Sequence, residues 1–136
     1  MSSAGLFVSI ACFSDPDLLA TIYDALLKAS HPERISFGIC LQVNDNDRQY
    51  DVLDQYDLVI VDRMPVCDAK GPIYARARCE ALLADEEYFL QIDCHTRFFP
   101  AWDDVLIQEL DKAEMLNPSA VLTHYPVNIK NMNRPE

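Results

Sequence analysis

The sequence alternates short apolar runs with segments of helical spacing, and this alternation limits the fold more than any other feature. Apolar runs rich in β-branched and aromatic residues indicate strands over residues 6–12, 35–43, 58–62 and 88–93. Helix-like segments separate these runs, which calls for a mainly parallel sheet with helices on both faces. The sequence therefore predicts an α/β fold, in which a mainly parallel central sheet is the middle layer of a three-layer sandwich.

Two helix starts are visible between these runs. Asp15 is followed by a proline, which is typical of an N-cap and a first helical position, and apolar residues at helical spacing continue to about Ser30. Gly71, also followed by a proline, opens a second helix that we expect to continue to about Ala84. Residues 49–55 are expected to form either a short helix or an irregular segment.

A third helix and a last strand are expected in the final part of the chain. The helix follows Trp102, which we interpret as a packing anchor rather than a platform for a ligand. Its apolar positions, expected to pack inward, are Val105, Leu106, Leu110 and Ala113. Residues 119–125 have the composition of a strand.

Composition and charge limit the cellular setting and the partners. A chain of 136 residues, of which 50% are apolar, can bury one core and is expected to form a single domain. The formal charge of -11 disfavours nucleic acid and anionic membranes as general partners. The five cysteines include no Cys-x-x-Cys pair, and no segment resembles a secretory leader or a membrane span. We therefore expect a soluble protein in the reducing cytoplasm.

The fourth apolar run ends in an Asp-x-His pattern that suits a metal site. Alternate side chains of a strand share a face, so Asp93 and His95 are expected to point the same way and Cys94 the opposite way. A carboxylate and a neutral imidazole at this position suit Mn²⁺, and Mg²⁺ with more reluctance. The alternative is a strand-end aspartate that caps the next turn beside a partly exposed histidine. A zinc site that combines Cys94 with His95 is disfavoured, because adjacent strand residues face opposite ways.

Two further polar segments are expected at the same edge of the sheet. Residues 44–48 carry amides and carboxylates directly after the second strand, although most such clusters are solvated loops. The helix that starts at Gly71 exposes backbone N–H groups, and Arg76 or Arg78 stands within its first turns. This helix start is a candidate to face a diphosphate, and the alternative is a pair of arginines on a solvated helix face.

Four segments, taken together, resemble a known family. They are Val8-Ser9-Ile10-Ala11 with Asp15-Pro16, then Gly71-Pro72-x-x-Ala75-Arg76, then Gln91-Ile92-Asp93-x-His95-x-Arg97-Phe98 with Trp102-Asp103, and Val121-Leu122-Thr123-x-Tyr125-Pro126. The second and third segments are specific in combination. The chain is similar in this way to the GlcNAc-type glycosyltransferase family, which includes cytoplasmic enzymes that attach N-acetylglucosamine to hydroxyproline on a protein.

The resemblance implies a GT-A nucleotide-sugar fold, which is Rossmann-like, and a metal-dependent transfer of GlcNAc from UDP-GlcNAc to a protein or glycan hydroxyl. Asp93 and His95 would be the Asp-x-His variant of the metal motif, binding Mn²⁺ or Mg²⁺. The same variant occurs in mucin-type polypeptide transferases, whose Gly-x-x-x-x-Arg helix start is similar to residues 71–76. By this likeness the donor-binding residues are Ala11, Phe13, Asp15, Gln42, Asn44, Asp45, Gly71 and Arg76.

A complete member of the family continues beyond this point, and its second half supplies the acceptor site, a further metal ligand and any catalytic base. Residues 1–136 are therefore expected to be a single donor-binding domain, truncated relative to the family and without an assigned catalytic residue. Apolar surface left exposed by the truncation would favour a homo-oligomer. One alternative is a non-catalytic module that keeps the fold as an interaction surface. Another is a generic doubly wound, flavodoxin-like domain that binds magnesium alone.

Overall fold

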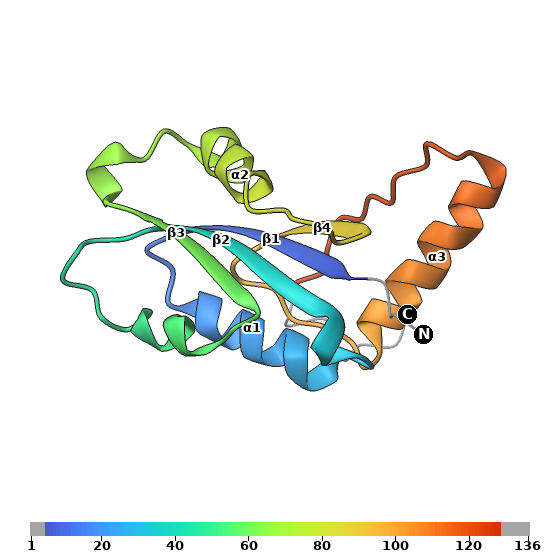
Figure 1. Ribbon diagram of the computed structural model, residues 1–136, viewed down its shortest axis with the longest axis horizontal. Helices are drawn as coiled ribbons and strands as arrows, with labels where there is room; N and C mark the ends of the chain where they lie inside the picture. Colours follow the sequence, from blue (N-terminus) through green and yellow to red (C-terminus); the bar gives the residue numbers. More distant parts are fainter. Residues whose placement is uncertain (1–4, 129–136) are drawn as a thin grey trace.

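The computed structural model describes residues 5–128 and contains a four-stranded, all-parallel sheet. The strands follow the order β3-β2-β1-β4 across the sheet (Figure 1). Their bounds are β1 (Leu6–Phe13), β2 (Ile35–Gln42), β3 (Val59–Met64) and β4 (Tyr88–Asp93). The predicted parallel sheet is confirmed, and each strand lies within about two residues of its predicted range. The prediction of one domain also covers residues outside the described range and stays a prediction.

Burial along the strands follows their places in the sheet. The central strands β1 and β2 are almost continuously buried, because both of their faces are covered. The outer strand β4 instead alternates between partly buried and exposed residues. Gly38 of β2 leaves the space that the Phe7 ring of β1 occupies, since a Cβ atom at this glycine would overlap the ring.

Helices cover both faces of the sheet, as the sequence predicts. Helix α1 (Asp17–Lys28) and the short 3₁₀ helix η2 (Asp51–Gln55) lie on one face, and helix α2 (Pro72–Glu80) lies on the other (Figure 1). The buried side chains of α1 include Leu18 and Ile22, which belong to the larger apolar core. On the opposite face a smaller cluster consists of Cys40, Met64, Ala75 and Cys79. The three-layer α/β sandwich is therefore present.

Two helices end earlier than predicted because other contacts take their backbone groups. Helix α1 ends at Lys28, before the predicted Ser30, since the Ser30 N–H donates to the carboxylate of Asp103 at 2.8 Å. Helix α2 ends at Glu80, four residues before the predicted Ala84. After Glu80, the N–H groups of residues 82 and 83 donate to carbonyls three residues back, as in a turn.

Helix α3 (Trp102–Leu116) is attached to the rest of the protein through its first turn. The Trp102 ring lies 4.4 Å from the Phe98 ring, and its Nε1 donates to the Ala25 carbonyl at 2.9 Å, so its predicted role as a packing anchor is confirmed. Beyond this turn most of α3 projects away from the sheet (Figure 1), although the Tyr88 hydroxyl of β4 donates to the Asp111 carboxylate of α3 at 3.4 Å. The prediction that Val105 and Leu106 pack inward is wrong, since 52% and 36% of their surfaces are exposed. Helical spacing identifies an apolar face but not what covers it.

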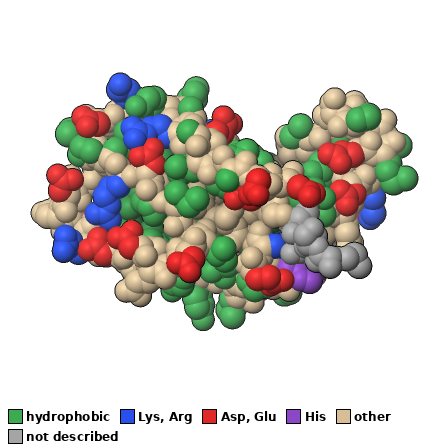
Figure 2. Space-filling model, viewed as in Figure 1, with side chains coloured by type: hydrophobic (Ala, Val, Ile, Leu, Met, Phe, Trp, Pro, Cys, Tyr) green, Lys and Arg blue, Asp and Glu red, His purple; other side chains and the backbone are tan. Residues whose placement is uncertain are grey.

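The predicted last strand is also absent from the described part of the chain. Residues 119–125 form no strand, and Val121 and Tyr125 are 79% and 93% exposed. After α3 the chain turns back toward β4 (Figure 1), but none of the described strands pairs with residues 119–125. Hydrophobic and acidic side chains lie side by side on the surface of α3 (Figure 2). Among residues 5–128, no helix has the length and apolar character needed to cross a membrane.

Candidate functional site

The carboxyl ends of all four strands lie at one edge of the sheet. The register pairs Phe13 with Gln42, and Gln42 with Met64, while Ala11 pairs with Asp93. Polar residues that lie far apart in the sequence therefore meet at this edge, as the strand pattern predicts. Open α/β sheets bind their ligands at this end of the strands.

Asp93 is the last residue of β4, and His95 follows two residues later. The Nε2 atom of His95 lies 3.9 Å from the Oδ2 atom of Asp93. Both side chains are open to solvent, with 60% and 62% of their surfaces exposed. The two groups lie on the same side of the chain and could share one ion.

Cys94 is buried while Asp93 and His95 are exposed, as the predicted alternation requires. Facing opposite ways does not keep Cys94 and His95 apart, however, since the Cys94 Sγ atom lies 3.9 Å from Nδ1 of His95. The physical reason is that β4 ends at Asp93 and the backbone bends over residues 94–95. Alternation of side chains holds only while the backbone stays extended.

Asp15 joins this group from the loop that follows β1. Its Oδ1 accepts the backbone N–H of Asp17 at 2.9 Å, as a helix cap does. Its Oδ2 lies 3.4 Å from both the Cys94 Sγ and the Nδ1 of His95. The hydrogen bond from Asp17 is the largest of the effects that lower the pKa of Asp15, and the contact with Cys94 is the largest of those that raise the pKa of His95. Sequence reasoning missed this contact, which depends on packing between segments almost 80 residues apart.

The start of α2 brings one of its two arginines to the site. Gly71 caps the helix with φ of 91°, a conformation that favours glycine. The Nη2 atom of Arg76 lies 3.7 Å from Oδ1 of Asp93. Arg78 is instead held by Asp62 through two hydrogen bonds of 2.6 Å. Arg76 is therefore the arginine that faces the Asp93 edge, while Arg78 has a structural role.

The loops after β1 and β2 hold the other predicted donor-binding residues. Phe13 is 56% exposed, whereas Gln42 is buried and its Nε2 donates to the Cys12 carbonyl at 3.2 Å. Ala11 is partly buried against the small cluster beneath α2. Asn44 and Asp45 are exposed in the turn after β2, on the opposite side of β1 from β4. The structure therefore groups Asp15, Arg76, Asp93 and His95 closely and places the β2 loop farther along the same edge.

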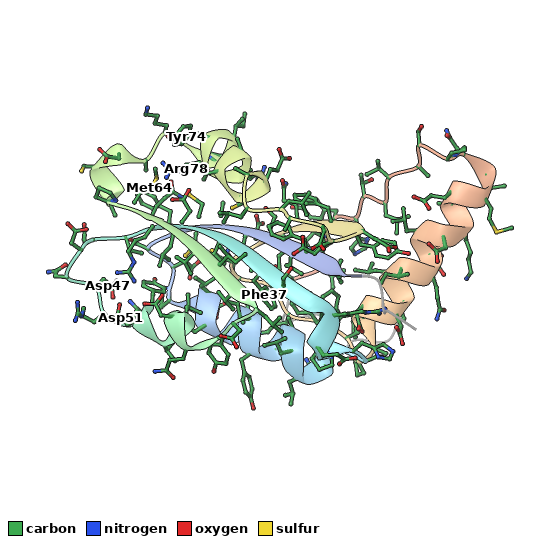
Figure 3. The ribbon with its side chains drawn as sticks, in the orientation of Figure 1. Phe37, Asp47, Asp51, Met64, Tyr74 and Arg78 are labelled. Atoms are coloured by element: carbon green, nitrogen blue, oxygen red, sulfur yellow. The ribbon has the colours of Figure 1, made fainter. Side chains whose placement is uncertain are left out.

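Two hollows in the described surface lie apart from this group. An apolar hollow of about 440 Å³ is lined by Tyr23, Leu26, Leu27, Pro32, Glu33 and Leu58. A polar hollow of about 360 Å³ is lined by Arg63, Met64, Pro65, Asp68, Lys70, Tyr74 and Arg78. Figure 3 shows Tyr74 and Arg78 on α2 beside Met64 at the end of β3. The polar hollow is lined by Arg78, one of the two arginines predicted at the start of α2, but neither hollow is lined by Asp15, Arg76, Asp93 or His95.

The residues at this edge fit a divalent cation. A carboxylate oxygen of Asp93 and Nε2 of His95 are ligands that Mn²⁺ accepts, and both are accessible. The Nδ1 atom of His95 faces the Asp15 carboxylate, as is usual for a metal-binding histidine whose second nitrogen donates to a carboxylate. With its proton on Nδ1, a neutral His95 would direct the Nε2 lone pair toward Asp93.

Comparison with known proteins identifies the family of this chain. The family model described as Glycosyltransferase (GlcNAc) matches the chain in two overlapping segments, residues 5–62 and 54–135. No curated protein matches the chain. Because the two segments together include nearly every residue, among them all the polar groups at the strand ends, the chain belongs to the GlcNAc glycosyltransferase family, a family of enzymes.

Proposed function

We propose that this chain is the donor-binding part of a metal-dependent glycosyltransferase that transfers GlcNAc from UDP-GlcNAc to a protein or glycan hydroxyl, and that it has a GT-A fold. The observation that carries the proposal is the convergence of Asp93, His95 and Arg76 at the carboxyl edge of a parallel sheet. Two ligands for a cation and a guanidinium suited to phosphate lie within one small area. Membership in the family supports the choice of sugar.

Asp93 and His95 would hold the cation, Mn²⁺ or Mg²⁺, through Oδ2 and Nε2. When bound, the ion neutralises charge that develops on the departing diphosphate. Arg76 can donate hydrogen bonds to phosphate oxygens from the other side of Asp93. The N-terminus of α2, which begins after Gly71, adds backbone N–H groups with partial positive charge. These groups give an acidic protein a local means of binding an anion.

The loops after β1 and β2 would bind the nucleoside. Phe13 offers an exposed ring against which a base can stack. Asn44 and Asp45 present exposed amide and carboxylate groups that can form hydrogen bonds with the base or ribose. Buried Gln42 holds the two loops together, since its carbonyl accepts the Ser14 N–H at 3.0 Å and its side chain bonds to β1.

In the proposed reaction, the bond between the anomeric carbon and the diphosphate oxygen breaks, and the acceptor hydroxyl forms a new bond to that carbon. The hydroxyl proton passes to a base, and the diphosphate leaves with the electron pair of the broken bond. Arg76 and the start of α2 stabilise the charge on the leaving group. We assign the base and the acceptor site to residues outside this group.

Calorimetric titration of UDP-GlcNAc with and without Mn²⁺ tests the proposal. We expect binding that requires Mn²⁺ and that is lost in Asp93→Ala and His95→Ala. Asp54→Ala is the matched control, because this exposed carboxylate lies on η2 and should leave binding unchanged. Equal binding by the wild type and both site variants would refute the metal assignment. Absence of binding in all conditions would refute the donor assignment for this chain.

A second candidate function is a non-catalytic module that serves as an interaction surface. The observation in its favour is the exposed apolar surface of α3, where Met115 and Leu116 are 87% and 90% exposed. Patches of this kind mark protein contacts. This hypothesis predicts a homo-oligomer or a stable complex without sugar transfer. A monodisperse monomer in solution scattering would contradict self-association.

A further inference from the structure

Three metal-ligating side chains meet on the inner side of His95, away from Asp93. Asp15 comes from the loop after β1, whereas Cys94 and His95 follow β4. Their ligand atoms all lie within 4.8 Å of one another. We propose that Asp15, Cys94 and Nδ1 of His95 form a second metal site that binds Zn²⁺, separate from the Asp93 side of the imidazole.

The distances between these ligand atoms match the edges of a zinc tetrahedron. Bonds of about 2.3 Å to sulfur and roughly 2.0–2.2 Å to nitrogen and oxygen place tetrahedral ligands roughly 3.3–3.6 Å apart. The Oδ2 atom of Asp15 lies 3.4 Å from both the Cys94 Sγ and the Nδ1 of His95. The remaining edge, from Sγ to Nδ1, is 3.9 Å. A small rotation of the exposed His95 ring would close it.

Two of the three ligands are held in place by the surrounding structure. Cys94 is 7% exposed, and its carbonyl accepts a hydrogen bond of 2.7 Å from the hydroxyl of buried Thr21 on α1. The other carboxylate oxygen of Asp15 is fixed by the N–H of Asp17. The third ligand, His95, is exposed and leaves a fourth position open to water. Three protein ligands and one open position are common at zinc sites.

The ligands on the two sides of the His95 imidazole favour different metal ions. A thiolate favours Zn²⁺ over Mn²⁺ and Mg²⁺, whereas the Asp93 side offers no sulfur. Binding would release the thiol proton of Cys94 to solvent, and the sulfur electron pair would form the bond to zinc. A neutral imidazole has one nitrogen lone pair, so zinc on Nδ1 leaves Nε2 as an N–H donor. Zn²⁺ should therefore weaken the binding of Mn²⁺ at Asp93. This consequence rests on the proposed function, whereas the zinc site does not depend on it.

Titration of the intact chain with Co²⁺, followed by displacement with Zn²⁺, tests the site without any nucleotide. We expect a thiolate-to-cobalt charge-transfer band that Zn²⁺ abolishes. Cys94→Ser should remove the band and weaken Zn²⁺ binding by more than about 100-fold, since loss of a supporting group alone costs 10- to 100-fold. Cys67→Ser is the matched control, because Cys67 is exposed and lies outside the cluster. An unchanged band in Cys94→Ser, or no band in the wild type, would overturn the proposal.

Two further variants distinguish loss of the zinc site from loss of the fold or of nucleotide binding. His95→Ala alters an exposed side chain, so its fold should stay intact by circular dichroism while Zn²⁺ binding is lost. Asp93→Ala should keep the cobalt band but lose the Mn²⁺-dependent binding of UDP-GlcNAc. Failure of the zinc site and failure of the proposed function are thus distinguishable. Zn²⁺ affinity that is unchanged in His95→Ala would overturn the assignment of Nδ1 as a ligand.

Discussion

Asp103 provides a sharp test of how α3 is attached, because its carboxylate is fully buried and has several hydrogen-bond donors around it. Oδ1 accepts the Ser30 N–H at 2.8 Å, and Oδ2 accepts the His31 N–H at 2.9 Å. Arg34 also donates to Oδ2, at 3.2 Å. In Asp103→Asn one oxygen is replaced by an NH₂ group that faces a donor, which leaves at least one buried N–H unpaired.

The structure sets how much stability the Asp103→Asn substitution should remove. A buried donor without its partner costs about 1–3 kcal/mol, and the charge paired with Arg34 adds to this. We expect Asp103→Asn to lower the free energy of unfolding by about 3 kcal/mol, measured by urea denaturation followed by circular dichroism. Asp104→Asn is the matched control, since its side chain is 35% exposed and also pairs with Arg34. Its loss should be about 0–1 kcal/mol.

The pH dependence gives a second measurement on the same residue. Burial raises the pKa of Asp103, but hydrogen bonds from the backbone of Ser30 and His31 outweigh it, so the folded pKa lies below its ordinary value. The stabilisation is therefore complete above the ordinary pKa of about 4 and is lost as the pH falls through the lowered folded value. The wild type should lose stability in that window more steeply than Asp103→Asn. Equal stability of the Asp103→Asn and Asp104→Asn variants, or parallel pH profiles of the wild type and Asp103→Asn, would refute the reasoning.

Two further predictions concern the sheet and the donor site. Gly38→Ala should destabilise the protein by about 1–3 kcal/mol in thermal unfolding, because the added Cβ overlaps the buried Phe7 ring, and an unchanged melting temperature would show that the ring can move without cost. Arg76→Ala should weaken Mn²⁺-dependent binding of UDP in calorimetry while leaving the melting temperature unchanged. Arg78→Ala should leave UDP binding unchanged and lower the melting temperature, because Arg78 is bonded to Asp62. UDP binding that is weakened only in Arg78→Ala would show that the roles of the two arginines are exchanged.

The layered fold could be predicted from local patterns. The predictions that failed, for residues 119–125 and for the apolar face of α3, have a common cause. Each strand is an apolar run that the sequence identifies, although how far it is buried depends on its place in the sheet. Residues 119–125 have the same composition, but a strand also needs a neighbour to accept its hydrogen bonds. Among the described residues no strand pairs with this segment, although it returns toward β4, and Val105 and Leu106 on α3 stay exposed.

The site was predictable only in part. Strand alternation placed Asp93 and His95 on one side, and the cap signal placed Asp15 at the start of α1. The position of two arginines at the start of α2 left both as candidates, and the family resemblance favoured Arg76. The structure adds that Arg76 approaches Asp93, whereas Arg78 is paired with Asp62. Trp102 was predicted as a packing anchor, but the partner it packs against and the role of Asp103 became clear only in the structure, where both attach α3 to α1 and to the residues that follow it.

The sequence by itself determined the parallel α/β architecture, the edge at which the polar residues gather and the Asp-x-His pair, because each depends on spacing along a few neighbouring residues. The tertiary structure alone decided that Asp15, Cys94 and His95 meet, and that Arg78 pairs with Asp62. These contacts join different elements, and their distances depend on how the helices and loops pack on the sheet, which no local spacing specifies.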